Sequence, residues 1–154
     1  MNHLSNEDAA YIAGLMDGEG YIGLIRNHFK SPNRTPSYHL KIEICNNCLD
    51  LLNWIKVTTG CGRIYKRKDS RASSWIISTS FCKDFLEAIY PYLRIKKLQT
   101  EVAFQYCKTV LPKYGSACKL TTEVVTKREE LRSKIIELNS RYRSNNQVIS
   151  TNYR

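Results

Sequence analysis

The 154-residue chain lacks any hydrophobic run long enough to cross a membrane. Its first residues, Met1–Ser5, lack the apolar core of a signal peptide. The cysteines follow no recognisable disulfide framework, and Cys45-Asn46-Asn47-Cys48 has no second such pair to complete a zinc site. We therefore expect reduced thiols in an intracellular protein, with an organelle and a prokaryotic cytoplasm both left open as the compartment.

Acidic residues are scarce, and local catalytic motifs of the common kinds are missing. The chain has 14 acidic against 24 basic residues, a net charge of +10, and ten Lys or Arg stand against three acids between Arg26 and Arg71. Such a balance predicts a polyanionic partner, although a merely solvated basic face would look the same. Gly60-Cys61-Gly62 is too short for a phosphate-binding loop, and the three histidines are scattered.

What the chain does have is a helix-like segment, Ile12–Gly20, that ends in a carboxylate. Ala10, Gly14 and Gly18 recur every four residues, so on a helix they form one smooth stripe that lets another backbone approach closely. Two copies packed along this stripe would place two Glu19 carboxylates together, and such a pair can hold a divalent cation. The alternative is an ordinary helix with a glycine C-cap and a solvated Glu19.

Hydrophobic periodicity and capping signals predict the order of the secondary structure. Ser5 and Asp8 read as a capping box for the first helix, and Asn47 with Asp50 as the cap of the second. Tyr11, Ile12, Leu15 and Met16 are expected to face the core. The predicted helices are 6–17, 47–59, 81–90, 96–111 and 121–142; the strands are 21–27, 38–45, 62–68 and 74–79; the loops are 29–36 and 69–73. This is an α+β chain of order α-β-β-α-β-β-α, expected to form one domain over residues 1–154 with a loose tail at 143–154.

Residues 12–20 resemble the LAGLIDADG motif of the homing endonuclease family at every position, with Glu19 as the acid. The chain has one copy, which is typical of the homodimeric members. The resemblance implies that the four antiparallel strands form a saddle on the DNA major groove, with helices on the opposite side. It also implies that the motif helices pair across a two-fold axis, through Ala10, Ala13, Gly14, Asp17 and Gly18.

The resemblance also implies the catalytic positions. Glu19 and the Gly18 carbonyl would bind metal, expected to be Mg²⁺, with Mn²⁺ or Ca²⁺ as structural substitutes. Asn46, after the second strand, would position solvent. Lys96, after Pro91-Tyr92-Leu93-Arg94-Ile95, would stabilise charge at the phosphate, with its neighbour Lys97 left open. Asp50 stands near a place where relatives often have a basic residue, so that role stays empty.

Strand alternation predicts which side chains face the DNA. His39, Lys41 and Glu43 alternate with apolar residues, as a face that reads base edges requires. In the first strand the assignment follows the family register, and a slip of one residue would reverse it. The full predicted set is Tyr21, Gly23, Ile25, Asn27, His39, Lys41, Glu43, Arg63, Tyr65, Arg67, Ser74 and Ile76.

Together these features predict a homodimeric, site-specific, metal-dependent DNA endonuclease. The resemblance implies that a mobile intron or intein encodes it, and the lack of flanking splicing segments favours an intron. It would cut both strands of a long pseudo-palindromic target and leave short 3′ overhangs. The alternatives are an RNA-binding intron maturase and a non-cleaving DNA-binding regulator on the same fold.

Overall fold

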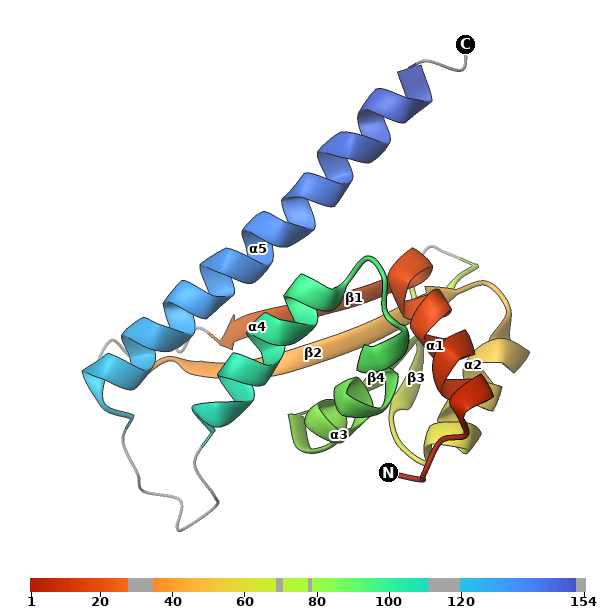
Figure 1. Ribbon diagram of the computed structural model, residues 1–154, viewed down its shortest axis with the longest axis horizontal. Coiled ribbons are helices and arrows are strands. Elements are labelled where there is room, and N and C mark those ends of the chain that lie inside the picture. Colours follow the sequence, from red (N-terminus) through yellow and green to blue (C-terminus); the bar gives the residue numbers. More distant parts are fainter. Residues whose placement is uncertain (28–34, 69–70, 78, 111–119, 152–154) are drawn as a thin grey trace.

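The computed structural model describes residues 1–27, 35–68, 71–77, 79–110 and 120–151 (Figure 1). These residues form five α-helices, a short 3₁₀ helix and a four-stranded sheet. The elements are α1 (Asn6–Glu19), β1 (Gly20–Asn27), β2 (Ser37–Asn46), α2 (Leu49–Thr59), β3 (Arg63–Lys66), β4 (Ser73–Ile77), α3 (Thr79–Ile89), the 3₁₀ helix Tyr90–Tyr92, α4 (Lys97–Lys108) and α5 (Thr122–Thr151). The predicted α+β class and element order are confirmed.

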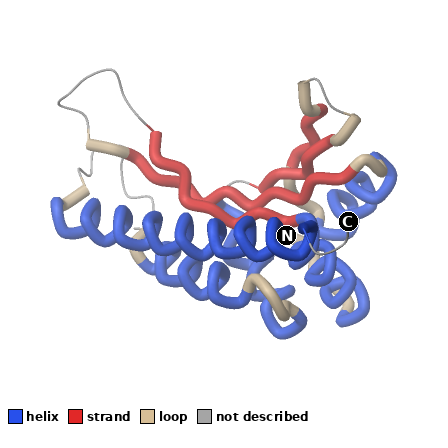
Figure 2. Tube along the Cα trace, turned by 90° about the horizontal axis from the view of Figure 1, so that it is seen from above, coloured by secondary structure: helices blue, strands red, loops and turns tan. Residues whose placement is uncertain are grey.

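The sheet is antiparallel, with strand order β1-β2-β4-β3. Helices cover one face, and the other face is curved and free of helices (Figure 2). The covered face presents a set of buried apolar side chains from three strands: Ile22, Leu24, Leu40, Ile42, Ile44, Trp75 and Ile77. The register predicted for the first strand is therefore confirmed, because Ile22 and Leu24 point to the core.

The first helix begins as predicted. The Ser5 hydroxyl accepts a hydrogen bond from the Asp8 backbone N–H at 3.1 Å, which satisfies one of the free donors of the first turn. Ile12 and Met16 are fully buried. The expectation for Tyr11 was wrong: its side chain is 54% exposed and meets the edge of the Trp54 ring on α2.

Helix α1 runs directly into β1 with no intervening loop. Gly20 ends the helix, and its backbone N–H still bonds to the Met16 carbonyl. A Cβ on Gly20 would lie 2.1 Å from Met16 Sδ and 2.4 Å from the Met16 carbonyl oxygen. The junction is therefore closed to any larger residue, and it fixes the direction in which the strand leaves the helix.

Replacing Gly20 with alanine is expected to destabilise the fold by about 1–3 kcal/mol, because the added carbon meets backbone that cannot move aside. Gly14→Ala in the same helix is the matched control. Space around Gly14 is open within the chain, so in the monomer this change should leave the stability unchanged or raise it by roughly 0.5–1 kcal/mol. Chemical denaturation measures both, and equal stability of the two variants would contradict the packing described here.

The two ends of helix α2 differ in how they are capped, and only the C-terminal cap agrees with the prediction. Gly60 ends it in a left-handed conformation, with φ +64°, as expected of a glycine C-cap. The predicted Asn47 cap was wrong, because Cys48 is the N-cap residue and its side chain makes no capping hydrogen bond. The Cys48 backbone N–H instead donates to the Asn46 side-chain oxygen at 2.7 Å. The side chain of Asn46, and not that of Asn47, therefore accepts this N–H.

Several predicted boundaries differ from the structure. Strand β3 is shorter than 62–68, and α3 begins at Thr79, which had been placed in the preceding strand. Helix α5 continues to Thr151 instead of ending at Tyr142, because no glycine or proline follows Gly115 to stop it. The predicted loop 29–36 falls outside the described residues except at 35 and 36. Of the predicted tip 69–73, positions 69 and 70 fall outside them, and Ser73 begins β4. The single-domain organisation stays a prediction.

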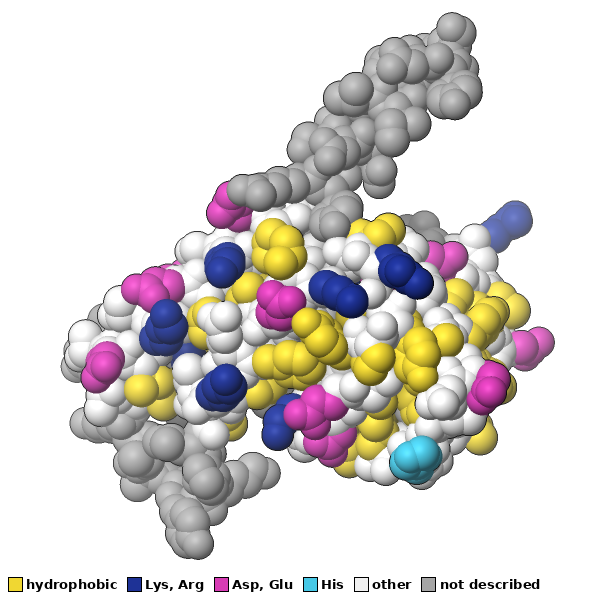
Figure 3. Space-filling view, in the orientation of Figure 1, with side chains coloured by type: hydrophobic (Ala, Val, Ile, Leu, Met, Phe, Trp, Pro, Cys, Tyr) yellow, Lys and Arg dark blue, Asp and Glu magenta, His cyan; other side chains and the backbone are white. Residues whose placement is uncertain are grey.

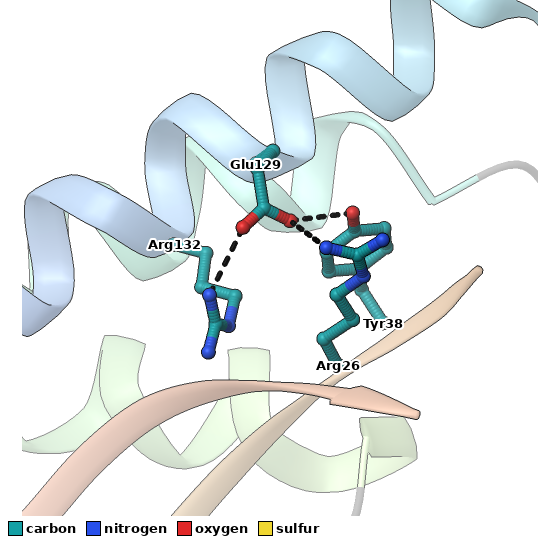
Figure 4. A network of polar contacts seen from close by, with 4 residues as sticks. All are labelled: Arg26, Tyr38, Glu129 and Arg132. Carbon is teal, nitrogen blue, oxygen red and sulfur yellow. Dashed lines mark hydrogen bonds and ion pairs between the residues drawn. The ribbon is translucent and has the colours of Figure 1, made fainter. Parts of the chain in front are cut away.

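Helix α5 packs along α4 and β1 (Figure 1). Leu131, Ile135 and Leu138 enter the core, and the Asn139 amide donates to the Ile22 carbonyl of β1 at 3.0 Å. Glu129 lies at the centre of a polar network between the helix and the strands (Figure 4). It accepts from Tyr38 Oη at 2.6 Å and Arg132 Nη1 at 2.9 Å, and Arg26 Nη1 lies 3.8 Å away.

The network lowers the pKa of Glu129 from its usual 4.5, first through the Tyr38 hydrogen bond and then through Arg132 and Arg26. A lowered carboxyl pKa stabilises the fold above the usual value, and this contribution is lost as the pH falls through the lowered pKa. Glu129→Gln should therefore cost about 1 kcal/mol at pH 7, a modest figure because the site is partly solvated. The difference from wild type should shrink as the pH falls below 4.5 and through the lowered pKa.

Thermal unfolding of both proteins between pH 3 and 7 measures this effect. Glu130→Gln is the control, since Glu130 is exposed and pairs only with Lys127 on its own helix. A loss of stability that is the same for both variants, or that does not shrink as the pH falls from 7 to 3, would contradict the proposed role of the network.

Within the described ranges, none of the helices combines the length and the apolar character needed to cross a lipid bilayer.

Candidate nuclease site

Two predicted catalytic residues meet where α1 and β2 end. Glu19 is the last residue of α1, and its side chain is exposed. Asn46, the last residue of β2, donates its amide to Glu19 Oε2 at 2.5 Å. The Cys48 backbone N–H bonds to the amide oxygen of Asn46, and this fixes which end of the amide faces Glu19. The structure therefore brings Asn46, which the family resemblance implied as a solvent-positioning residue, into direct contact with Glu19.

Lys96 lies beside the same end of α1. It is the N-cap residue of α4, and its ammonium donates to the backbone carbonyl of Asp17 at 2.5 Å. Lys97, the alternative left open by the sequence, turns elsewhere: its ammonium lies 5.7 Å from the centre of the Tyr90 ring. The structure thus places Lys96, of the two lysines, next to the turn that bears Glu19.

The Lys96 ammonium is half-buried, and burial lowers its pKa because desolvation disfavours the charged form. The neighbouring Asp17 carboxylate offsets part of this shift. A lysine in such a setting is a donor and cation close to the backbone of the Glu19 turn, which suits contact with an anionic group.

The acidic donors of one chain are too few for a complete metal site. Among the described residues, no three histidine, cysteine or acidic side chains lie close enough to share an ion. Glu19 uses one oxygen to accept from Asn46, and its exposure leaves the carboxylate accessible. Mg²⁺ usually takes one or two carboxylates and keeps several waters. A single Glu19 with the neighbouring Gly18 carbonyl therefore supplies part of the ligand set of such a site.

The open face of the sheet carries all the predicted DNA-contacting residues. Strand pairing sets Tyr21 opposite Glu43, Gly23 opposite Lys41 and Ile25 opposite His39. Further along the same face, toward β4 and β3, Ile76 pairs with both Glu43 and Arg63, and Ser74 pairs with Tyr65. Residues directly opposite one another point to the same face. The predicted set is thus brought together on one surface, while its contact with DNA stays a prediction.

Two members of this set are covered in the free chain. A Cβ on Gly23 would lie 2.1 Å from the Tyr21 hydroxyl oxygen, so the Tyr21 ring lies across Gly23 and buries it. Ser74 is only 2% exposed. Direct contact from Gly23 would therefore require the Tyr21 ring to move.

Charged side chains on the open face are partly engaged with one another. Lys41 Nζ lies 2.7 Å from Glu43 Oε2 on the same strand. Burial would raise the pKa of Glu43, but the Lys41 hydrogen bond and charge outweigh it and lower the pKa overall. Arg63 and Arg67 lie on the exposed side of the sheet, and Arg67 Nη1 approaches Cys45 Sγ at 3.5 Å. The guanidinium of Arg63, in contrast, makes no hydrogen bond or ion pair with the other described residues, so it is available to a ligand.

The predicted helix-pairing surface is exposed in most of its positions. Ala10, Gly14 and Gly18 are exposed, and nothing within 4 Å occupies the space that a side chain at Gly14 or Gly18 would fill. Ala13 is different, because it is fully buried in the core of its own chain and cannot contact a partner. On the helix-covered side of the molecule, hydrophobic side chains gather where α1 and α3 lie (Figure 3).

Asp17 also differs from its predicted place at the pairing surface. Its carboxylate turns to its own chain and accepts from the backbone N–H groups of Arg94, Ile95 and Lys96 at 2.7, 3.1 and 2.9 Å. The sequence offers no signal for this contact. The partners lie 77 to 79 residues away, and they are backbone groups that any residue would supply.

Comparison with known proteins gives the family. A profile of the family described as LAGLIDADG endonuclease matches residues 12–110, more than half of the chain. A search of curated proteins finds no match. Among solved structures, the homing endonuclease I-CvuI, crystallised with DNA in the presence of Mg, is similar with a TM-score of 0.72 at 22% identity, over 84% of this chain and 80% of that one.

Two further structures are similar. The archaeal intron-encoded homing endonuclease I-Vdi141I, complexed with DNA, gives a TM-score of 0.74 at 14% identity, over 86% of this chain and 84% of that one. The LAGLIDADG homing endonuclease I-SmaMI, bound to cleaved DNA, gives 0.67 at 16% identity, over 86% of this chain but 45% of that one. At these identities the likeness shows the fold. With the profile match across the motif, the sheet and α4, the chain belongs to the LAGLIDADG endonuclease family.

Proposed function

We propose that this protein is a homodimeric, site-specific DNA endonuclease that depends on a divalent metal ion. The observation that carries the proposal is the exposed Glu19 carboxylate, held by Asn46 beside Lys96 at the point where α1 enters the open sheet. A carboxylate, an amide and a lysine at one end of a basic surface suit hydrolysis of a phosphodiester.

Pairing of two chains would complete the site. One chain has one motif and one Glu19, and the open space along Gly14 and Gly18 leaves room for a second backbone. The similarity to I-SmaMI, whose chain is about twice as long as the part matched, supports a dimer as the working unit. The two Glu19 side chains would then flank one shared ion or two separate ions.

The open face of the sheet would bind double-stranded DNA. Its concave shape and its exposed arginines suit a duplex groove, where arginine bonds bidentately to guanine. Two-fold symmetry of the protein predicts a long, nearly palindromic target, with one half read by each subunit. I-CvuI and I-Vdi141I are both seen in complex with DNA, which supports the same partner here.

At the centre, Glu19 and the Gly18 carbonyl would hold the ion, which we expect to be Mg²⁺. When bound, such an ion polarises the phosphate and activates water. Asn46 holds the Glu19 carboxylate in orientation and offers its amide to nearby solvent. Lys96 presents a half-desolvated cation to the scissile phosphate. Cuts in both strands across the minor groove would leave short 3′ overhangs, in keeping with an enzyme that inserts its own intron.

The test is cleavage of a randomised duplex library in Mg²⁺, with sequencing of the ends, alongside the molecular mass in solution. Double-strand breaks at one pseudo-palindromic sequence by a dimer would support the proposal. Selective binding of a folded intron RNA without cleavage would instead support a maturase. Duplex binding without cleavage would support a regulator.

A further inference from the structure

The carboxylate of Asp17 makes hydrogen bonds that have no part in the proposed binding of the metal. It is the sixth residue of Ile12–Gly20 and lies two residues before Glu19. Its Oδ2 accepts from Arg94 and Ile95, and its Oδ1 accepts from Lys96, all through backbone N–H groups. With both oxygens engaged in this way, the carboxylate is committed to the turn that precedes α4, and it is poorly placed to bind an ion as well.

The contact is reciprocal. Lys96 donates its backbone N–H to the Asp17 side chain, and its ammonium to the Asp17 backbone carbonyl. Four hydrogen bonds therefore join the last turn of α1 to residues 94–96. Helix α1 also packs against the 3₁₀ helix Tyr90–Tyr92 just before these residues, and the three bonds to the Asp17 carboxylate add a direct link between the last turn of α1 and the backbone of Lys96.

We propose that Asp17 is a positioning residue, which sets the Lys96 ammonium against the Glu19 end of α1 and acts on DNA cleavage through Lys96. The inference rests on the proposed function. It assigns to the two acids of the segment separate tasks: Glu19 faces the metal and the phosphate, and Asp17 holds the cation in place.

A double-mutant cycle tests the proposal. Asp17→Asn keeps the size of the side chain, but its amide nitrogen cannot accept a hydrogen bond, so at least one of the three backbone bonds is lost. The single-turnover cleavage rate at saturating protein should fall by about 10²-fold, as expected when a catalytic group is displaced by roughly an ångström. Binding of the target duplex should stay within about twofold.

In a Lys96→Ala background, Asp17→Asn should reduce the rate no further, because its effect passes through the missing lysine. Asp84→Asn, on the exposed side of α3, is the matched control and should cleave like the wild type. Asp17→Glu retains an acceptor carboxylate and should recover part of the rate. It also serves as the second variant if Asp17→Asn unfolds, as judged by circular dichroism.

The outcomes are distinct. Failure of the wild type to cleave any duplex overturns the proposed function itself. Cleavage by Asp17→Asn at the wild-type rate overturns the inference alone. A further loss in the Lys96→Ala background would also overturn it, because Asp17 would then act by a route of its own, such as metal binding.

Discussion

Replacing Glu19 with glutamine is expected to abolish DNA cleavage, with a fall in rate of at least about 10³-fold, while the protein still binds its target. The change removes one negative charge from each half of the metal site, and metal stabilisation of the transition state is worth several kcal/mol. The glutamine carbonyl can still accept from the Asn46 amide, so the local structure should survive.

Cleavage of the selected duplex in Mg²⁺ measures the rate, and a gel-shift assay measures binding. Glu7→Gln makes the same chemical change in the first turn of the same helix, and it should leave both quantities close to the wild type. Cleavage by Glu19→Gln at an unchanged rate would remove Glu19 from the site, and the assignment of the metal would fall with it.

Replacing Gly14 with leucine is expected to give a folded but inactive monomer. Gly14 is exposed, and a Cβ added there meets nothing within 4 Å in its own subunit, so the isolated chain has room for the start of a larger side chain. Leucine also favours a helix over glycine by about 0.8–1.0 kcal/mol, and the isolated chain should not lose stability. In a close-packed pair of helices, overpacking costs roughly 1–3 kcal/mol per added side chain, and the two-fold axis doubles the penalty.

The dimer dissociation constant should therefore rise by about 30-fold to 10⁴-fold, as each 1.4 kcal/mol is a factor of ten. Analytical ultracentrifugation measures the association, and the cleavage assay should show activity falling in parallel. Ser133→Leu adds the same side chain to an exposed position of α5 and is expected to change neither. A Gly14→Leu protein that remains dimeric and active would place the subunit interface elsewhere.

Sequence patterns predicted the sheet well, because each strand has one buried face and a register slip would expose it. The alternation of Leu40, Ile42 and Ile44 with His39, Lys41 and Glu43 fixed the orientation of β2, and strand pairing extended it to β1. The meeting of Glu19, Asn46 and Lys96 came from the family resemblance. Nothing in their spacing along the chain predicts it.

The faces of α1 were harder to predict. Neighbouring helical residues differ by about 100° in direction, so small side chains on two adjoining faces read as one surface. Ala13 belongs to the core and Gly14 to the open stripe, although both are small. Tyr11 was expected in the core for its size, but it finds the Trp54 ring at the surface.

Contacts made by backbone groups were beyond prediction. The Asp17 carboxylate reaches N–H groups far along the chain, and no side-chain pattern encodes such partners. The Cys48 N–H likewise donates to the side chain of Asn46 and not to that of Asn47. Both contacts lie at the candidate site, where local sequence rules are least able to decide between near-equal alternatives.

The tight passage at Gly20 also bears on the geometry of the substrate. If α1 pairs the subunits and the sheet binds the duplex, this direct junction between α1 and β1 holds the sheet at a fixed distance and angle from the subunit interface. One extra base pair at the centre of a target would turn the distal half by about 35° and shift it by roughly 3.4 Å. A junction with no spare length cannot follow such a rotation, so the spacing between half-sites would depend on a single residue that has no Cβ.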